Sequence, residues 1–222
     1  MRHYSVLIAS HKEVTMLHSK TQVRRVYDPL LRALHWVIAL SVVALIASSQ
    51  LAEAFEDGPY ETAIWNLHIL AGYGLTVALL TRLLWGLVGP ASARWQDLWH
   101  PATWKNSLKN LRLPSAHRVG HDPVASLAYL FAYGVMALMV VTGLGLAASE
   151  FQAGPLAAWL GNAGWVEDLT EDPHEVGFAL MLGFVGLHMA ALVFHQLRGE
   201  RVAQSMVTGK QYLNSESGVQ HD

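Results

Sequence analysis

The sequence contains no cysteine and few charged residues. The lack of cysteine excludes disulfides, iron–sulfur clusters and thioether-linked cofactors. Charged residues make up 14% of the chain and hydrophobic residues 52%, whereas a soluble domain has about 25% charged residues. Residues 1–22 also lack an apolar stretch long enough for a signal peptide. The composition therefore indicates a membrane protein. Either Met1 or Met16 could be its first residue. No nucleic-acid partner is expected.

Four long stretches contain no Asp, Glu, Lys or Arg. They cover residues 33–52, 62–81, 123–149 and 176–197. A helix needs about 20 apolar residues to cross the hydrocarbon core of a bilayer. We therefore expect an all-α membrane protein, a four-helix transmembrane bundle over residues 28–200. Its spans should lie at about 29–52, 61–88, 123–148 and 173–198, between an N-terminal segment (1–27) and a tail (201–222).

Dipeptides that favour a helix start precede three of these spans. Each places Asp at the N-cap position and Pro at the first helical position, and they are Asp28-Pro29, Asp122-Pro123 and Asp172-Pro173. The stretch from Ala91 to Gly120 mixes Trp with Lys and Arg. That mixture predicts a segment lying on the membrane surface.

Basic residues are distributed unevenly between the two ends of the expected bundle. The loops at 53–61 and 150–173 contain no Lys or Arg but carry nine carboxylates: Glu53, Glu56, Asp57, Glu61, Glu150, Glu167, Asp168, Glu171 and Asp172. The N-terminal segment, the middle loop and the tail hold nearly all of the 15 Lys and Arg. By the positive-inside rule, both termini should be cytoplasmic in a multi-pass protein of the bacterial inner membrane.

Four histidines lie inside or at the ends of the apolar spans: His35, His68, His174 and His188. A titratable ring inside a membrane span is costly, so it normally faces the bundle interior and has a function. His174 and His188 share one face of one helix, about 21 Å apart along its axis at 1.5 Å per residue. Two ligands on one helix, with one from each of two others, predict two bis-histidine iron sites at different depths.

Depth determines the expected pairing of these histidines. His68 and His174 fall near the outer side and form the outer pair, whereas His35 and His188 fall nearer the cytoplasm and form the inner pair. Because the chain has no cysteine, each group held by a pair would be a b-type haem. Iron with two imidazole ligands has no free coordination site, so these haems would transfer electrons and not bind oxygen.

Arg82 and three glycines accompany the histidines. Arg82 lies deep in the second span at the expected level of the inner haem, where it would contact a haem propionate or a quinone oxygen; snorkelling to lipid headgroups is the alternative. Gly72, Gly177 and Gly186 lie close to ligands in the sequence, so they would make room for porphyrin or, alternatively, for close helix packing. Of the other histidines, His121 is a candidate for a quinone site, and His195 lies at the membrane edge.

Several motifs together resemble the bacterial cytochrome b561 family, which includes the b-type cytochrome subunits of nickel–iron hydrogenases and formate dehydrogenases. They are Arg32-Ala33-Leu34-His35-Trp36, His68-Ile69-Leu70-Ala71-Gly72, Arg82-Leu83-Leu84-Trp85-Gly86, Gly120-His121-Asp122-Pro123 and Met206-Val207-Thr208-Gly209-Lys210. The resemblance covers roughly Val26 to Gln211. Pro173, next to an expected ligand, departs from the family pattern.

The resemblance implies a four-helix dihaem electron carrier of the inner membrane that exchanges electrons with quinone or quinol and a partner protein. The chain is most similar to free-standing members that pair with soluble c-type cytochromes, and the cytochrome subunit of a nickel–iron hydrogenase is the second possibility. Two further hypotheses remain open at this stage. One is a self-contained oxidoreductase acting on superoxide or ferric iron, and the other is a haemless bundle that relays protons through histidines.

Overall fold

The computed structural model describes residues 22–110, 123–199 and 201–213. Its long helices are α2 (Pro29–Ala54), α3 (Glu61–Val88), α5 (Pro123–Ser149) and α7 (Gly164–Leu197). All four are long and apolar enough to cross a membrane. The fold is therefore an all-helical, multi-pass membrane bundle, as the sequence predicts.

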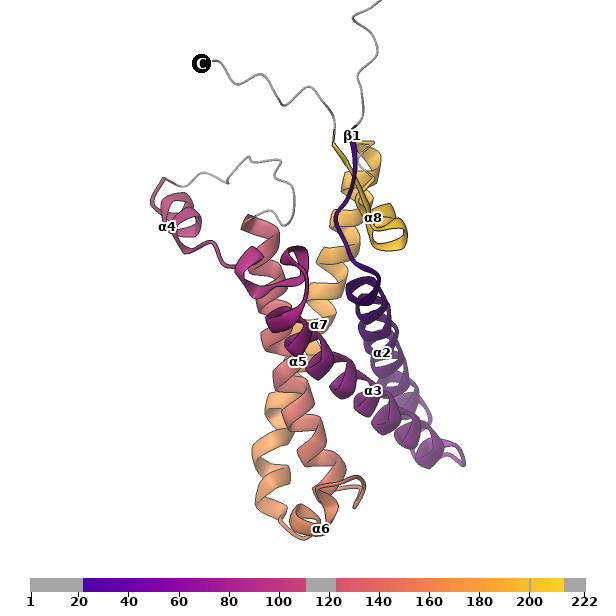
Figure 1. Cartoon of the computed structure of the whole chain (residues 1–222). Helices are drawn as coiled ribbons and strands as arrows, with labels where there is room; N and C mark the ends of the chain where they lie inside the picture. Colours follow the sequence, from indigo (N-terminus) through magenta and orange to yellow (C-terminus); the bar gives the residue numbers. More distant parts are fainter. Residues whose placement is uncertain (1–21, 111–122, 200, 214–222) are drawn as a thin grey trace, which may run out of the picture.

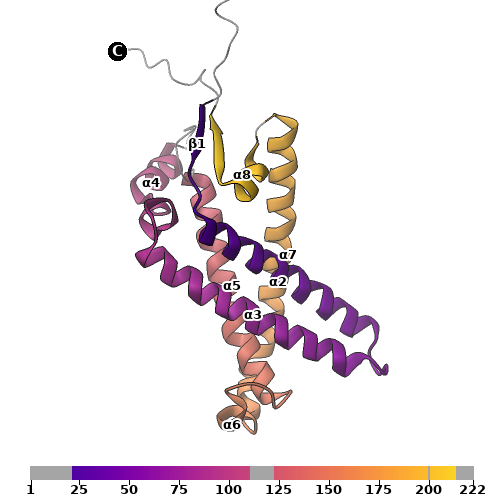
Figure 2. The same ribbon diagram turned by 45° about the vertical axis from the view of Figure 1, so that its right-hand side comes forward.

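The four long helices form two antiparallel pairs (Figures 1 and 2). Helix α2 packs along α3 and α5 packs along α7, and α3 also contacts α5. In both views the pairs diverge toward the turn between α2 and α3 and toward the short helix α6 (Ala157–Leu160). We call this the acidic end, because it carries the nine carboxylates of the two loops defined above.

The start of α2 follows the sequence prediction. The Asp28 carboxylate accepts a hydrogen bond of 2.9 Å from the Leu31 amide, and Pro29 is the first helical residue. This arrangement satisfies a backbone donor that has no partner within the helix. The corresponding prediction at Asp122 lies outside the described residues.

The expected start of the fourth span at Asp172-Pro173 is wrong. Helix α7 begins nine residues before Pro173, at Gly164, and continues through that proline. Packing on α5 explains the early start: a Cβ atom at Gly145 would lie 3.1 Å from Thr170 and 3.3 Å from Val166, so the missing side chain lets these turns approach. Proline removes one backbone hydrogen bond from a helix interior, and tertiary contacts of this kind offset that loss.

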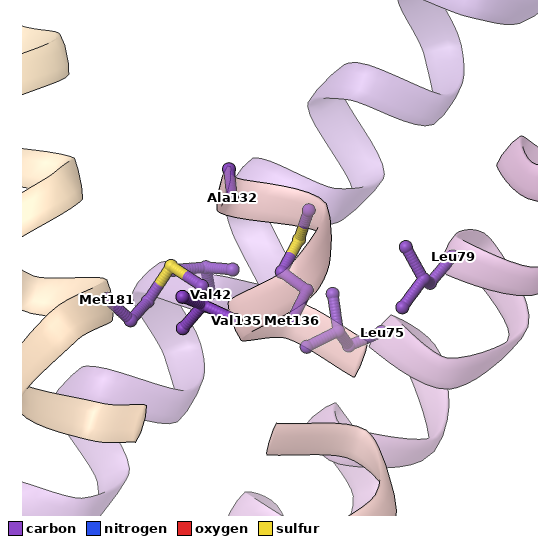
Figure 3. Packing of buried hydrophobic residues seen from close by; sticks show 7 residues of the cluster. All are labelled: Val42, Leu75, Leu79, Ala132, Val135, Met136 and Met181. Atoms are coloured by element: carbon purple, nitrogen blue, oxygen red, sulfur yellow. The ribbon is translucent and has the colours of Figure 1, made fainter. Parts of the chain in front are cut away.

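A hydrophobic core joins the two helix pairs at mid-depth (Figure 3). It consists of Val42, Leu75, Leu79, Ala132, Val135, Met136 and Met181, which come from all four long helices. Met181 lies seven residues from both His174 and His188, or about 10 Å along the axis at 1.5 Å per residue. Val42 and Leu75 lie seven residues after His35 and His68. The core therefore lies midway between the levels of the two histidine pairs.

Two short strands, the first and last described segments of the chain, pair beside the start of α2. Strand β1 (Gln22–Arg25) pairs antiparallel with β2 (Lys210–Leu213), which follows the short helix α8 (Val202–Thr208). The Arg32 guanidinium donates a hydrogen bond to the Val207 carbonyl, and the Trp36 indole donates one to the Met206 carbonyl. Part of the expected N-terminal segment and tail therefore folds against the bundle, which the sequence analysis did not predict.

The connection after α3 contains three short helices within its described residues, 89–110. They are η2 (Ala91–Ala93), η3 (Trp95–Asp97) and α4 (Pro101–Asn110). The indole of Trp95 donates a hydrogen bond of 3.1 Å to the Leu83 carbonyl. It also lies against Gly86, where any Cβ atom would clash with its ring. This connection is therefore fastened to the end of α3.

Candidate functional site

A cavity of about 850 Å³ lies between the diverging helix pairs. Pockets for small ligands and cofactors usually measure about 300–1,000 Å³, so the volume suits a large organic group. Val42, Leu75 and Met181 of the core line one part of it. His68 of α3 and His174 of α7 line it as well, so the structure brings both members of the outer pair to one cavity.

The ring of His68 is held by the neighbouring helix. Its Nδ1 atom lies 3.0 Å from the hydroxyl of Ser48 on α2. The indole of Trp65 contacts the ring edge-on, with 5.6 Å between ring centroids. These two contacts fix the orientation of the imidazole.

The ring of His174 is held in the same manner within the other helix pair. Its Nδ1 atom lies 2.8 Å from the hydroxyl of Thr142 on α5. The next residue is Gly143, where a Cβ atom would lie 3.1 Å from Cε1 of His174. The glycine thus provides the space that lets the ring lie directly against α5.

The inner pair lies on the other side of the core. His35 is on α2, seven residues before Val42, and His188 is on α7, seven residues after Met181. Their neighbours are aromatic: Trp36 contacts His35 edge-on at 5.7 Å, and Phe184 stacks on His188 at 5.9 Å between centroids. Both rings are half-buried. The arrangement therefore places two histidine pairs on opposite sides of the hydrophobic core.

A family model and several relatives match most of this chain. The family model described as "Prokaryotic cytochrome b561" matches residues 26–209. The chain belongs to this family. The relatives that carry the name "Probable Ni/Fe-hydrogenase B-type cytochrome subunit" include three that match 74% to 90% of this chain. The one from Azotobacter chroococcum mcd 1 is 31% identical over 74% of this chain and 78% of its own length.

The other two relatives match over longer segments. The one from Bradyrhizobium diazoefficiens is 28% identical over 83% of this chain and 84% of its own length. The one from Rhodobacter capsulatus is 26% identical over 90% of this chain and 86% of its own length. Together with the four apolar helices, these matches identify a membrane b-type cytochrome, for which haem b is the implied cofactor.

The residues around the cavity fit a haem. Imidazole nitrogens are common axial ligands of haem iron, and two imidazoles from opposite helix pairs line this cavity. Gly72 also lines it, and a Cβ atom there would approach only Leu45, at 3.9 Å. Gly177 has a different role, because a Cβ atom there would clash with Met139. It therefore serves close packing of α5 on α7.

Arg82 lies apart from the cavity of this cytochrome and is buried against two aromatic rings. Its side chain is 3% exposed, and its guanidinium lies 4.9 Å from the Trp95 centroid and 5.6 Å from the Tyr133 centroid. Such cation–π contacts stabilise a buried guanidinium. Its Nε and Nη1 atoms have no hydrogen-bond partner among the described residues. The Arg82 side chain does not extend to the lipid headgroups, because it is buried inside the protein.

Carboxylates surround the cavity at the acidic end. The acidic residues that line it are Glu53, Glu56, Glu61, Glu150, Glu171 and Glu175. Burial, with added repulsion from Glu167 and Glu171, raises the pKa of the Glu150 carboxyl above its ordinary value. Since no Lys or Arg occurs in either loop, this end of the molecule has a negative potential.

Sequence reasoning missed the two hydroxyl residues behind the outer pair. Ser48 and Thr142 are small polar residues within apolar runs, which was an available signal, but their partners lie on other helices and become visible only in the fold. Of the remaining histidines, His121 lies outside the described residues. His195 contacts the Phe194 ring near the end of α7.

Proposed function

We propose that this cytochrome carries electrons across the bacterial inner membrane, between the quinone pool and a redox partner, through two b haems. The inner haem would be held by His35 and His188, and the outer haem by His68 and His174. The observation that carries the proposal is the presence of His68 and His174 in one cavity between two helix pairs. The position of His35 and His188 at one level on the other side of the core, each seven residues from a core residue, supports it.

The chain's own residues would bind, orient and shield the haems. Haem supplies a one-electron couple, and its iron would take one imidazole from each helix pair at each level. The core around Val42, Leu75 and Met181 separates the two levels and keeps water out between them. Many large apolar side chains on the outside of the helices are exposed and would face lipid.

Replacement of one ligand should remove one haem and leave the other. We expect His68→Ala and His174→Ala each to lose the same half of the haem b absorbance, and His35→Ala and His188→Ala each to lose the other half, because six-coordinate binding needs both imidazoles. Optical redox titration of the purified variants measures which haem remains.

The matched control for these variants is His195→Ala, which removes a histidine two turns after His188 on the same helix. It should retain both haems. Two haems in His174→Ala, or the loss of a haem in His195→Ala, would contradict the proposed ligands.

We further propose that both termini are cytoplasmic and that the acidic end faces the periplasm. The distribution of Lys and Arg supports this orientation by the positive-inside rule. A reporter enzyme that is active only in the periplasm should be inactive when fused after Asp222 and active when inserted after Gly161, in the connection between α6 and α7. The opposite pattern of activity would refute the orientation.

For Arg82 we propose that Nε and Nη1 bind an oxygen of an inner-haem propionate or of a quinone. In Arg82→Gln, loss of the positive charge should lower the midpoint potential of the inner haem if the partner is a propionate. It should instead raise the KM for quinol several-fold if the partner is a quinone. The control is Arg94→Gln, because Arg94 bonds to the Gly89 carbonyl at 2.8 Å. An unchanged potential and an unchanged KM would exclude both partners.

The acidic end indicates a partner with a basic surface, for which a soluble periplasmic c-type cytochrome is our proposal. Opposite charges accelerate association, and salt screens the effect. Stopped-flow electron transfer to such a partner should therefore slow as ionic strength rises. Joint neutralisation of Glu167, Asp168, Glu171 and Asp172 should slow it by about tenfold at low salt, within the range known for electrostatic steering.

The control for this experiment is an equal change of charge on the opposite side of the membrane. Neutralisation of Glu13, Glu200, Glu216 and Asp222 should leave the rate unchanged. Rates that respond neither to salt nor to the four substitutions at the acidic end would rule out the basic partner.

A nickel–iron hydrogenase is the second candidate partner. The names of the relatives favour it, and it would use the same two histidine pairs. Purification from native membranes in mild detergent separates the candidates, because a co-purifying hydrogenase brings nickel whereas a c-type cytochrome brings covalently bound haem.

A further inference from the structure

We propose that Ser48 and Thr142 are positioning residues for the outer haem. Each would hold one axial imidazole in the tautomer that directs Nε2 to the iron, and each would increase the electron donation of its ring. The inference rests on the proposed function, since it assumes that His68 and His174 are ligands.

The Ser48 hydroxyl determines the protonation of His68. It lies 3.1 Å from the Leu45 carbonyl and 3.0 Å from His68 Nδ1. A hydroxyl has a single proton, and we assign it to the bond with the Leu45 carbonyl. The Ser48 oxygen then accepts the second hydrogen bond, which places the proton of the neutral imidazole on Nδ1. Nε2 then carries the free lone pair that a metal requires.

Thr142 forms the same relay with His174. Its hydroxyl lies 2.8 Å from the Leu138 carbonyl of its own helix and 2.8 Å from His174 Nδ1. The hydroxyl donates to the carbonyl, a common arrangement for Thr in a helix, and accepts from the imidazole. Two ligands on different helices therefore have the same protonation, fixed by the same chemistry.

Both hydroxyls lie behind the rings as seen from the cavity. His68 and His174 line the cavity, whereas Ser48 and Thr142 do not belong to the described residues that line it. Both are buried, with 2% and 5% exposure. The Nδ1 edge of each ring thus faces protein, and the opposite edge, with Nε2, is left for the cavity.

Each half of the site is complete within one helix pair. Ser48 on α2 orients His68 on α3, and Thr142 on α5 orients His174 on α7. The pairs α2·α3 and α5·α7 are also the closely packed ones. The imidazoles are therefore oriented before a haem joins the two pairs.

Such hydrogen bonds affect the redox properties of a metal site. A partner that accepts the second ring N–H of a ligating histidine fixes the tautomer and ring orientation and raises the basicity of the ligand. A more basic ligand stabilises ferric over ferrous iron. Removal of the acceptor should therefore raise the midpoint potential of the outer haem and leave that of the inner haem unchanged.

The test compares Thr142→Val with Thr142→Ser in the purified full chain. The valine variant has nearly the same shape without the hydroxyl, so the midpoint potential of the outer haem should rise and the g-values of its ferric signal should shift. The serine variant retains the hydroxyl and should resemble the wild type. Ser48→Ala should act in the same direction as Thr142→Val, and the double variant should shift further.

Thr81→Val is the matched control, because the half-buried Thr81 bonds through its hydroxyl to the Val77 carbonyl, at 2.7 Å, and to no histidine. The positioning role would also be supported if Thr142→Val lost the outer haem and Thr142→Ser retained it. Equal effects of valine and serine at 142, or no shift in any variant, would overturn it. Two different results would contradict the proposed function itself. They are a wild-type protein that lacks two haems and a His174→Ala variant that keeps the outer haem.

Discussion

Burying an imidazole within an apolar helix costs free energy unless its nitrogens have hydrogen-bond or metal partners. The packing of the bundle depends on meeting this requirement. In the outer pair, Ser48 and Thr142 bond one nitrogen of each ring and leave the other for the cavity. Each hydroxyl lies on the neighbouring helix of the same pair. The need for these hydrogen bonds therefore also determines which face of α2 packs on α3 and which face of α5 packs on α7. The fold and the site thus depend on the same contacts.

The divergence of the helix pairs provides the space that the histidines need. At mid-depth the hydrophobic core, which includes Val42 and Met181, holds the two helix pairs together. Toward the acidic end the pairs separate and enclose a cavity of about 850 Å³. Small residues adjust the spacing. Gly145 and Gly177 let α7 lie close to α5, whereas Gly143 accommodates the ring of His174. A redox group held there would lie close to the negatively charged end of the molecule.

Much of this architecture could be predicted from the sequence, because membrane spans have a strong signal. Apolar run lengths predicted four spans, and the Asp28-Pro29 cap was correctly placed. Depth along the helices predicted that His68 would meet His174, and both line one cavity. The predicted start of α7 was wrong. Pro173 favours a helix start locally, but the packing of Val166 and Thr170 on Gly145 lets the helix begin earlier and continue through Pro173. Local patterns do not encode contacts between distant segments. Such contacts produce the stacking of Arg82 on Trp95, the pairing of β1 with β2 and the hydroxyl partners of the histidines.

The proposed electron path requires two histidine pairs that hold two b haems in one chain. The most direct measurement is the ratio of haem b to polypeptide in the purified protein, with the ferric spectrum recorded at low temperature. We expect a ratio of two and two low-spin signals, since both irons would have two imidazole ligands. A ratio of one, a high-spin signal from either haem, or protein without haem would contradict it.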